Sequence, residues 1–314
     1  MAVTDMERYV LEEWAEDYRA GRLARREFLR RLTVMAGGTA LAVPILERLG
    51  IAASADELAQ AAGTPPAAAA APSGVTVPPD DPAIEVVGMI TFPAGTGTGL
   101  GYVAKPRGSG PFPGVLVIHE NRGLLEHFKD VVRRLAKVGY VGLAVDLASY
   151  QGGTERFSDL AQVTAVLAQT PPDQHVATMN AAIRYLQGLP YVRRDRIGAT
   201  GFCFGGGMCW RLATANPDLR AAIPFYGPNP PLEDVPKIRA AVLAIYGELD
   251  GRINAGIPAL REALQRAGVT HEIVIYPGAD HAFFNDTGAR YNATAARQAW
   301  ERLLGWFDRY LRGG

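Results

Sequence analysis

The sequence has few cysteines, no excess of charge of either sign and no long apolar run, and each absence excludes a class of protein. Only Cys203 and Cys209 occur among the 314 residues. A helix beginning just after Cys203 would turn by about 100° per residue and place the two thiols on different faces, too far apart for a bridge. The sequence therefore predicts neither a disulfide framework nor a cysteine metal site.

Charge and hydropathy limit the partners. Lysine plus arginine and aspartate plus glutamate both total 32, so the formal net charge is zero. The basic excess that drives binding to a phosphate backbone is missing. The apolar run at residues 32–46 is too short and too rich in glycine and alanine for a stable membrane span. We expect a small-molecule substrate, no nucleic-acid partner, no stable membrane span, and a monomer or small homo-oligomer.

Residues 1–62 form an extension that allows two interpretations. The apolar run is preceded by Arg25-Arg26-Glu27-Phe28-Leu29-Arg30-Arg31. This order resembles a twin-arginine export signal with a small-residue cleavage site at Ala53-Ser54-Ala55, and it predicts a periplasmic or extracellular protein. The alternative is an uncleaved amphipathic arm on a cytoplasmic protein, because apolar residues recur at helical spacing at Met6, Val10, Trp14 and Tyr18.

Composition also divides the remainder of the chain. Alanine and proline crowd into residues 63–82, a stretch that cannot form a core and is typical of a linker. Residues 83–314 then remain for one catalytic domain, which is an ordinary size for a single α/β domain.

Short β-rich runs alternate with helical patterns beyond Pro82. The predicted strands are Ala83–Phe92, Leu100–Ala104, Val115–His119, Tyr140–Val145, Arg196–Gly201, Ala221–Tyr226, Ala241–Tyr246 and His271–Tyr276. The first two should pair as a hairpin through the glycine-rich turn at residues 94–99. Predicted crossover helices include Glu126–Lys137, Asp173–Gln187, Ile257–Arg266 and Ala289–Leu311. This order predicts an α/β fold with an eight-stranded, mostly parallel sheet covered by helices on both faces.

One motif carries the chemistry. After the fifth predicted strand the chain reads Gly201-Phe202-Cys203-Phe204-Gly205, which is the G-x-S-x-G nucleophile elbow with cysteine in place of serine. Flanking glycines allow a strand and a helix to approach closely around a strained turn that presents the nucleophile. The alternative is a buried structural cysteine in a glycine-rich turn.

Two further residues complete a triad in the chain order of α/β-hydrolases. Asp250 follows the seventh strand and His281 follows the eighth, which gives the order nucleophile, acid, base. Glu248 and Asp280 lie beside the chosen residues. We predict Asp250 as the acid because it lies further into its loop, where a carboxylate can reach the imidazole.

Four motifs together resemble one family. They are His119-Glu120-Asn121-Arg122-Gly123, Asp146-Leu147, Gly-Phe-Cys-Phe-Gly-Gly from Gly201, and Asp-His-Ala-Phe from Asp280. In this order, over residues 84–311, they resemble the dienelactone hydrolases, also called carboxymethylenebutenolidases. The resemblance implies an α/β-hydrolase fold and a thioester route for ester or lactone hydrolysis. It also implies that Glu120 takes the thiol proton and that the backbone N–H groups of Asn121 and Phe204 hold the oxyanion.

The sequence departs from this family at the substrate. Members that act on dienelactone carry arginines at the places of Tyr150 and Asn285, so neither place supplies a cation here. Arg122 is the remaining candidate cation. Aromatic residues flank the predicted triad at Phe202, Phe204, Phe283 and Phe284, and they favour a neutral ester over an acidic lactone.

Other interpretations remain for comparison. A zinc-protease motif at His119-Glu120 would need a histidine at position 123, which is Gly123. His119 is interpreted as structural, and no metal or cofactor is predicted. The rival function is a non-hydrolytic thiol-based binding or redox protein on the same fold, although Cys209 is poorly placed as a resolving cysteine.

Overall fold

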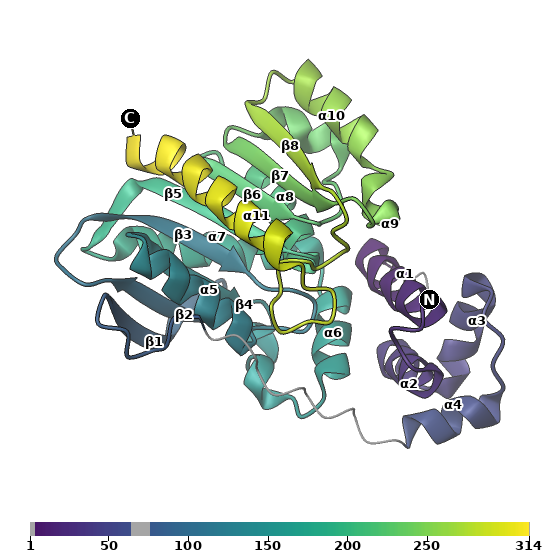
Figure 1. The fold of residues 1–314 in the computed structure, drawn as a ribbon. Coiled ribbons are helices and arrows are strands. Elements are labelled where there is room, and N and C mark those ends of the chain that lie inside the picture. The colour runs from purple at the N-terminus through teal and green to yellow at the C-terminus, as the bar shows by residue number, and fades with distance from the viewer. Residues whose placement is uncertain (1–3, 64–75, 314) are drawn as a thin grey trace. The chain divides into compact units, whose positions relative to one another are not determined.

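The computed structural model describes residues 4–63 and 76–313. Most of the predicted linker, residues 64–75, lies outside the described residues. The chain divides into two compact units. The smaller contains the described residues up to Gly63 together with Asn121–Gly123 and Thr154–Pro171, and the larger contains the remainder (Figure 1).

An eight-stranded mixed sheet forms the centre of the larger unit, in the order β1-β2-β4-β3-β5-β6-β7-β8. β1 runs antiparallel to β2 and β2 antiparallel to β4, and all other neighbours are parallel. The predicted α/β fold is therefore confirmed. The strands are β1 (Ile84–Ala94), β2 (Gly97–Pro106), β3 (Phe112–Ile118), β4 (Val141–Asp146), β5 (Val192–Phe202), β6 (Ala221–Phe225), β7 (Ala241–Gly247) and β8 (His271–Tyr276).

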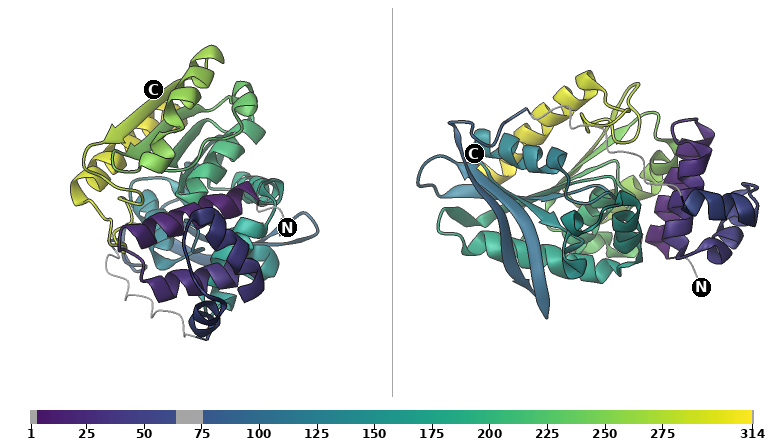
Figure 2. Two further views of the ribbon diagram at one scale, coloured as in Figure 1. Left: turned by 90° about the vertical axis from the view of Figure 1, so that its right-hand side faces the viewer. Right: turned by 90° about the horizontal axis from the view of Figure 1, so that it is seen from below.

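Helices cover both faces of this sheet. α5 and α11 lie on one face and α7 and α8 on the other, which Figures 1 and 2 show from three sides. The central strands β3, β4, β6 and β7 are buried nearly throughout, as expected for strands covered on two faces. The helices of this unit are α5 (Glu126–Lys137), α7 (Pro172–Gly188), α8 (Phe204–Ala215), α9 (Gly251–Asn254), α10 (Ile257–Arg266) and α11 (Ala293–Phe307).

Two details differ from the predicted elements. The last helix begins at Ala293 and not at residue 289, because Asn292 caps it by accepting a hydrogen bond from the N–H of Ala295 at 3.1 Å. A π-helical turn at Asp308–Gly313 follows it. The first hairpin is longer than predicted, since Ala94 pairs with Gly97 and only two residues remain in the turn.

The smaller unit is helical. It contains α1 (Asp5–Arg19), α2 (Arg25–Ala36), α3 (Thr39–Leu49), α4 (Ala55–Ala62) and α6 (Leu160–Gln169). Capping boxes start two of these helices, at Thr4 with Glu7 and at Ser54 with Glu57. α1 and α2 both pack against α6, a helix that the sequence did not reveal and that comes from within the region predicted as the catalytic domain.

No single helix among the described residues is both long and apolar enough to cross a membrane. α2 and α3 reach that length and composition only when taken together, and the chain bends by 116° between them.

Candidate active site

Cys203 occupies a strained turn between β5 and α8. Its backbone has φ 57° and ψ −118°, a positive φ that non-glycine residues rarely adopt. The flanking glycines are required by close contacts. A Cβ on Gly201 would lie 2.0 Å from the carbonyl oxygen of Gly205, and a Cβ on Gly205 would lie 2.4 Å from the carbonyl oxygen of Ile118. The turn therefore folds as a nucleophile elbow does.

His281 and Asp250 meet in the buried interior beside this turn. Nδ1 of His281 lies 2.5 Å from Oδ2 of Asp250, and the two residues are only 3% and 1% exposed. Asp250 also caps α9, because its Oδ1 accepts from the N–H of Ile253 at 3.4 Å. Its carboxylate is thus fixed on both oxygens, and it fixes the ring of His281.

The thiol of Cys203 lies next to the same ring. Its Sγ is within 4.8 Å of a ring nitrogen of His281. Nδ1 of His281 is bound to Asp250, which leaves Nε2 as the ring nitrogen available to the thiol. Carboxylate, imidazole and thiol are therefore neighbours in that order.

The electrostatics of the site favour a protonated imidazole. Burial alone would lower the pKa of His281, but the charges of Asp250 and of the Cys203 thiolate outweigh burial and hold that pKa well above its usual value. Burial alone would raise the pKa of Asp250, but His281 and then Arg252 hold it below its usual value. The raised pKa of His281 therefore favours a protonated ring beside Asp250.

The two neighbouring carboxylates contact other groups. Oε2 of Glu248 accepts from the backbone N–H of Gly278 at 2.8 Å. Oδ1 of Asp280 accepts from the backbone N–H of His281 at 2.7 Å. Both support the loop that carries His281, whereas Asp250 is the residue whose carboxylate contacts its ring.

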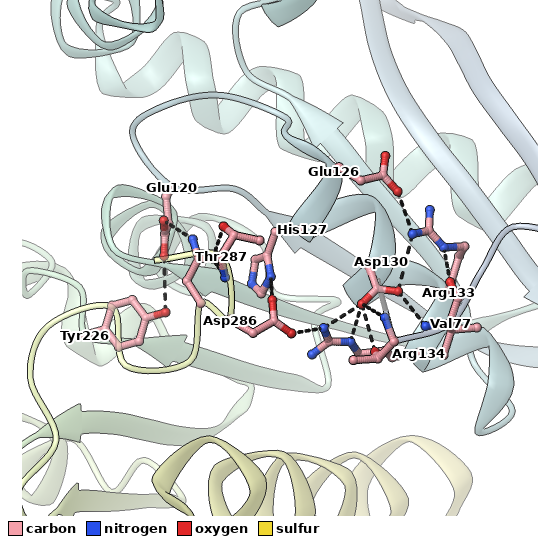
Figure 3. A network of polar contacts seen from close by, with 12 residues as sticks. Val77, Glu120, Glu126, His127, Asp130, Arg133, Arg134, Tyr226, Asp286 and Thr287 are labelled. Atoms are coloured by element: carbon pink, nitrogen blue, oxygen red, sulfur yellow. Dashed lines mark hydrogen bonds and ion pairs between the residues drawn. The ribbon is translucent and has the colours of Figure 1, made fainter. Parts of the chain in front are cut away.

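Glu120 lies at the end of β3 and is held by two neutral donors, as Figure 3 shows. Its Oε2 accepts from Nδ2 of Asn285 at 2.9 Å, and its Oε1 accepts from the hydroxyl of Tyr226 at 3.4 Å. Asn285, which the sequence placed where the family has a substrate-binding arginine, therefore binds the predicted proton acceptor.

The loop after His281 is tied to α5 by a polar network (Figure 3). Asp286 accepts from Nδ1 of His127 at 2.8 Å and from the guanidinium of Arg134. Arg134 in turn bonds to Asp130, whose other oxygen accepts from the N–H of Val77 at 2.9 Å. Asn285 and Asp286 are adjacent, so this network fixes the position of the amide that contacts Glu120.

His119 connects two neighbouring strand ends. Burial lowers the pKa of this ring, so it is neutral at neutral pH. Nε2 accepts from the N–H of Leu147 at 3.0 Å, which leaves the proton on Nδ1 to be donated to the carbonyl oxygen of Glu120 at 2.6 Å. The ring thereby joins the ends of β3 and β4.

The four phenylalanines predicted to flank the site are buried. Phe202 and Phe284 stack with their rings 5.2 Å apart in a buried aromatic cluster. Phe283 packs on Tyr226 at 5.6 Å, and Phe204 is fully buried as the first residue of α8.

Tyr150 lies elsewhere in the larger unit. Tyr150 follows β4, two strands from β5, and its hydroxyl donates to the carbonyl oxygen of Ala94 at 3.1 Å. Arg122 belongs to the smaller unit, as does Asn121, whose side-chain amide donates to Glu13 at 3.1 Å.

Sequence reasoning missed two residues at this site. Tyr226 follows β6 with a positive φ of 35°, and its ring lies 5.1 Å from that of His281. Burial, and then the charges of Glu120 and Cys203, raise its pKa well above the usual value. Arg290 reaches the carbonyl oxygen of His281 at 3.5 Å. Tyr226 could have been found from the strand order, because β6 is the neighbour of β5.

The sheet order, the strained turn after β5 and the paired Asp250 and His281 that follow β7 and β8 are those of an α/β-hydrolase fold. Residues 100–311 match the dienelactone hydrolase family, and the chain belongs to that family of hydrolases.

Individual proteins agree with this assignment. A protein of Methylorubrum extorquens named as a carboxymethylenebutenolidase is 36% identical over 237 residues, which are 72% of this chain and 81% of that protein. A crystal structure from Klebsiella pneumoniae named as a dienelactone hydrolase has a TM-score of 0.68 at 33% identity, over 73% of this chain and 100% of that one. A dienelactone hydrolase-like promiscuous phosphotriesterase from metagenomic libraries has a TM-score of 0.66 at 26% identity, over 73% and 99%.

Proposed function

We propose that this protein hydrolyses a carboxylic ester or lactone through a thioester on Cys203, with His281 as acid and base and Asp250 as the residue that orients it. The observation that carries the proposal is the buried 2.5 Å contact between Asp250 and His281 beside the strained turn of Cys203.

The first half of the reaction forms the acyl-enzyme. The thiolate of Cys203 attacks the carbonyl carbon, and the electron pair of the C=O bond moves to the oxygen. As this tetrahedral intermediate collapses, the C–O bond to the alcohol breaks and the imidazolium of His281 gives its proton to the leaving oxygen. The raised pKa of His281 suits this step, because the ring enters it protonated.

The second half consumes water. The neutral imidazole takes a proton from water, the hydroxide attacks the thioester carbonyl, and the thiolate leaves as the carboxylic acid forms. The imidazolium and thiolate are then restored, so the cycle balances without a cofactor.

Three groups support these steps. The N–H of Phe204 belongs to the first turn of α8, where backbone donors lack an intrahelical acceptor, and it serves as an oxyanion donor. The N–H of Asn121 is its proposed companion. Glu120 is the proposed acceptor of the thiol proton when substrate arrives, and it is held ready by Asn285 and Tyr226.

The substrate class follows from charge. Asn285 is a neutral amide already bound to Glu120, and the hydroxyl of Tyr150 is bound to the backbone of Ala94. A carboxylate buried without a matched cation is strongly disfavoured. We therefore propose a neutral ester or lactone, with Arg290 and Arg122 as the cations whose involvement would reverse this preference. Because the metagenomic relative is a promiscuous phosphotriesterase, a neutral phosphotriester is a suitable test substrate beside a neutral ester and an anionic lactone.

The rival redox function is less well supported. A redox role requires a second reactive thiol, but burial raises the pKa of Cys209 to about 12, and its Sγ contacts the carbonyl oxygen of Ala199 at 3.8 Å. A thiol of that pKa carries almost no thiolate at neutral pH and does not resolve a disulfide.

The decisive experiment measures hydrolysis of a fluorogenic short-chain ester by the parent, Cys203→Ala and Cys209→Ala, each with and without iodoacetamide. The parent should be active and blocked by the reagent, Cys203→Ala should be inactive, and Cys209→Ala should match the parent. A Cys203→Ala enzyme with a rate within about tenfold of the parent would exclude Cys203 as the nucleophile, since loss of a nucleophile ordinarily costs many orders of magnitude.

A further inference from the structure

A buried ion-pair cluster joins α2 to α6 within the smaller unit. Arg30 is 4% exposed and donates to Glu27 through Nε at 2.8 Å and Nη2 at 2.9 Å. Its guanidinium also bonds to both oxygens of Asp159. Burial would raise the pKa of Glu27, but Arg30 and Arg31 outweigh burial and lower it to about 2. A buried guanidinium that binds two carboxylates is a specific structural interaction, unlike an exposed ion pair on the protein surface.

Asp159 has a second role in the same place. It is the N-cap of α6, where its Oδ1 accepts from the N–H of Ala161 at 2.9 Å. One carboxylate thus starts α6 and binds the N-terminal extension.

The other end of α6 is bound as well. Nε2 of Gln169 donates to the carbonyl oxygen of Met35 at 2.9 Å, and the hydroxyl of Thr4 donates to the carbonyl oxygen of Ala168 at 3.2 Å. Phe28 and Leu29 of the twin-arginine-like stretch are buried, as are Val163 and Leu167 of α6. α6 is therefore held at both ends by residues of the extension.

The arginine pair itself has different surroundings. Arg26 is exposed. Arg25 donates to the hydroxyl of Tyr18 at 3.0 Å, to Glu57 at 3.1 Å and to the carbonyl oxygen of Ala52. These contacts bridge the two sides of the sequence Ala53-Ser54-Ala55, which lies at the capped start of α4.

The extension also reaches the predicted oxyanion loop. Glu13 of α1 accepts from Nδ2 of Asn121 at 3.1 Å, and both residues belong to the smaller unit. Asn121 directly follows Glu120 in the chain. A contact to its side chain restrains the peptide that bears its N–H.

We propose that residues 4–62 remain on the working enzyme as a helical cap of α6, anchored by Arg30, and that Glu13 of this cap is a positioning residue for Asn121. The second part rests on the proposed function, whereas the first does not. In this arrangement Phe28, Leu29 and Arg30, which make the segment look like an export signal, are core residues of the smaller unit.

The first test is the mass of the protein isolated from its own cells. N-terminal peptide mapping should recover peptides from residues 1–62 in the active fraction. An active enzyme that begins near Ala55 would overturn the proposal.

The second test measures hydrogen exchange in the full chain, comparing Arg30→Met with Arg26→Met. Replacing Arg30 should speed exchange of the α6 amides at residues 160–169 by about tenfold or more, because loss of the anchor favours local opening. Replacing the exposed Arg26 should leave those amides unchanged. If Arg30→Met does not fold, Gln169→Ala and Thr4→Val should raise the same rates. Unchanged α6 exchange in these variants would refute the anchoring.

The third test addresses Glu13. Glu13→Ala should lower kcat for ester hydrolysis by about tenfold with KM within about twofold, because an oxyanion donor acts in the transition state. Glu13→Gln keeps a carbonyl acceptor and should restore most of kcat, and exposed Glu12→Ala is the matched control. Equal kcat for Glu13→Ala and Glu12→Ala would refute the positioning role. The exchange results do not depend on activity, so they stand even if Cys203 is not the nucleophile.

Discussion

Replacement of Asp250 by asparagine tests the acid with little change in shape. Asp250 accepts two hydrogen bonds, from Nδ1 of His281 and from the N–H of Ile253. An asparagine has one oxygen and one NH2 group, so it can accept only one of them. If the NH2 group faces His281, the ring must accept at Nδ1 and carry its proton on Nε2, where it can no longer take a proton from water. If the oxygen faces His281, the NH2 group opposes the N–H of Ile253 and the cap of α9 is lost.

Both outcomes also remove the charge that holds the pKa of His281 up. We expect kcat to fall by roughly 10³ to 10⁴ with KM within about threefold, which corresponds to about 4–5 kcal/mol in the transition state. The pH dependence follows from the sign of the shift. A raised folded pKa gives stability that is complete below the unfolded pKa, about 6.5, and is lost as pH rises through the folded value. The stability difference between the parent and Asp250→Asn should therefore be larger at pH 6 than at pH 10.

The assay is steady-state hydrolysis of an aryl ester, with urea unfolding at both pH values. Glu248→Gln is the matched control, because its amide oxygen can still accept from Gly278, and it should retain kcat within about twofold. If Glu248→Gln loses more activity than Asp250→Asn, the acid has been assigned to the wrong residue.

Two further predictions concern the substrate and the loop network. The parent should show a higher kcat/KM for a neutral aryl ester than for a carboxylated dienelactone of similar size; the opposite preference, abolished by Arg290→Gln or by Arg122→Gln, would identify the cation that replaces the missing arginines. Asp286→Asn should lower the free energy of unfolding by about 2 kcal/mol at pH 7 by weakening the contacts to His127 and Arg134. Burial raises the pKa of Asp286, but those two contacts outweigh it and lower that pKa, so this stability is lost as pH falls through the folded value. Urea unfolding of the parent and of Asp286→Asn should therefore converge as pH falls through the folded pKa of Asp286, and a difference that persists once this carboxylate is protonated would contradict the ionic origin.

The sequence predicted the fully buried strands β6 and β7 closely, since both begin at the predicted residue and end within one residue of the predicted bound. The edge strand β8 and the helix α10 have the predicted bounds. β5 was predicted to begin at Arg196, but it begins at Val192 because Phe112 of β3 pairs with Val192 ahead of a charged stretch. A charged stretch near the start of a strand hides the alternating or apolar pattern by which strands are predicted. The backbone hydrogen bonds that define the strand do not depend on side-chain polarity.

Within the candidate site, the sequence could order Cys203, Asp250 and His281 but could not give their surroundings. Tyr226 and Arg290 reach His281 through strand neighbours and a loop fold that depend on the sheet order. The pairing of Asn285 with Glu120 joins residues 165 positions apart. Such contacts follow from tertiary packing, which a single sequence without its fold does not contain.

The helix α6 shows why the extension could not be assigned from its own pattern. Its sequence is Leu-Ala-Gln-Val-Thr-Ala-Val-Leu-Ala-Gln, apolar on most of its circumference. A helix that is apolar on most sides must pack against other elements on several sides. An amphipathic helix buries only its apolar face. α1 and α2 pack on α6, and each buries an apolar side that includes Trp14 or Phe28. The segment around Phe28 and Leu29 in α2, which follows the arginine pair, is therefore explained by its packing on α6. Removal of residues 4–62 would expose Val163 and Leu167 to water, and the truncated enzyme should aggregate at concentrations where the full chain stays in solution.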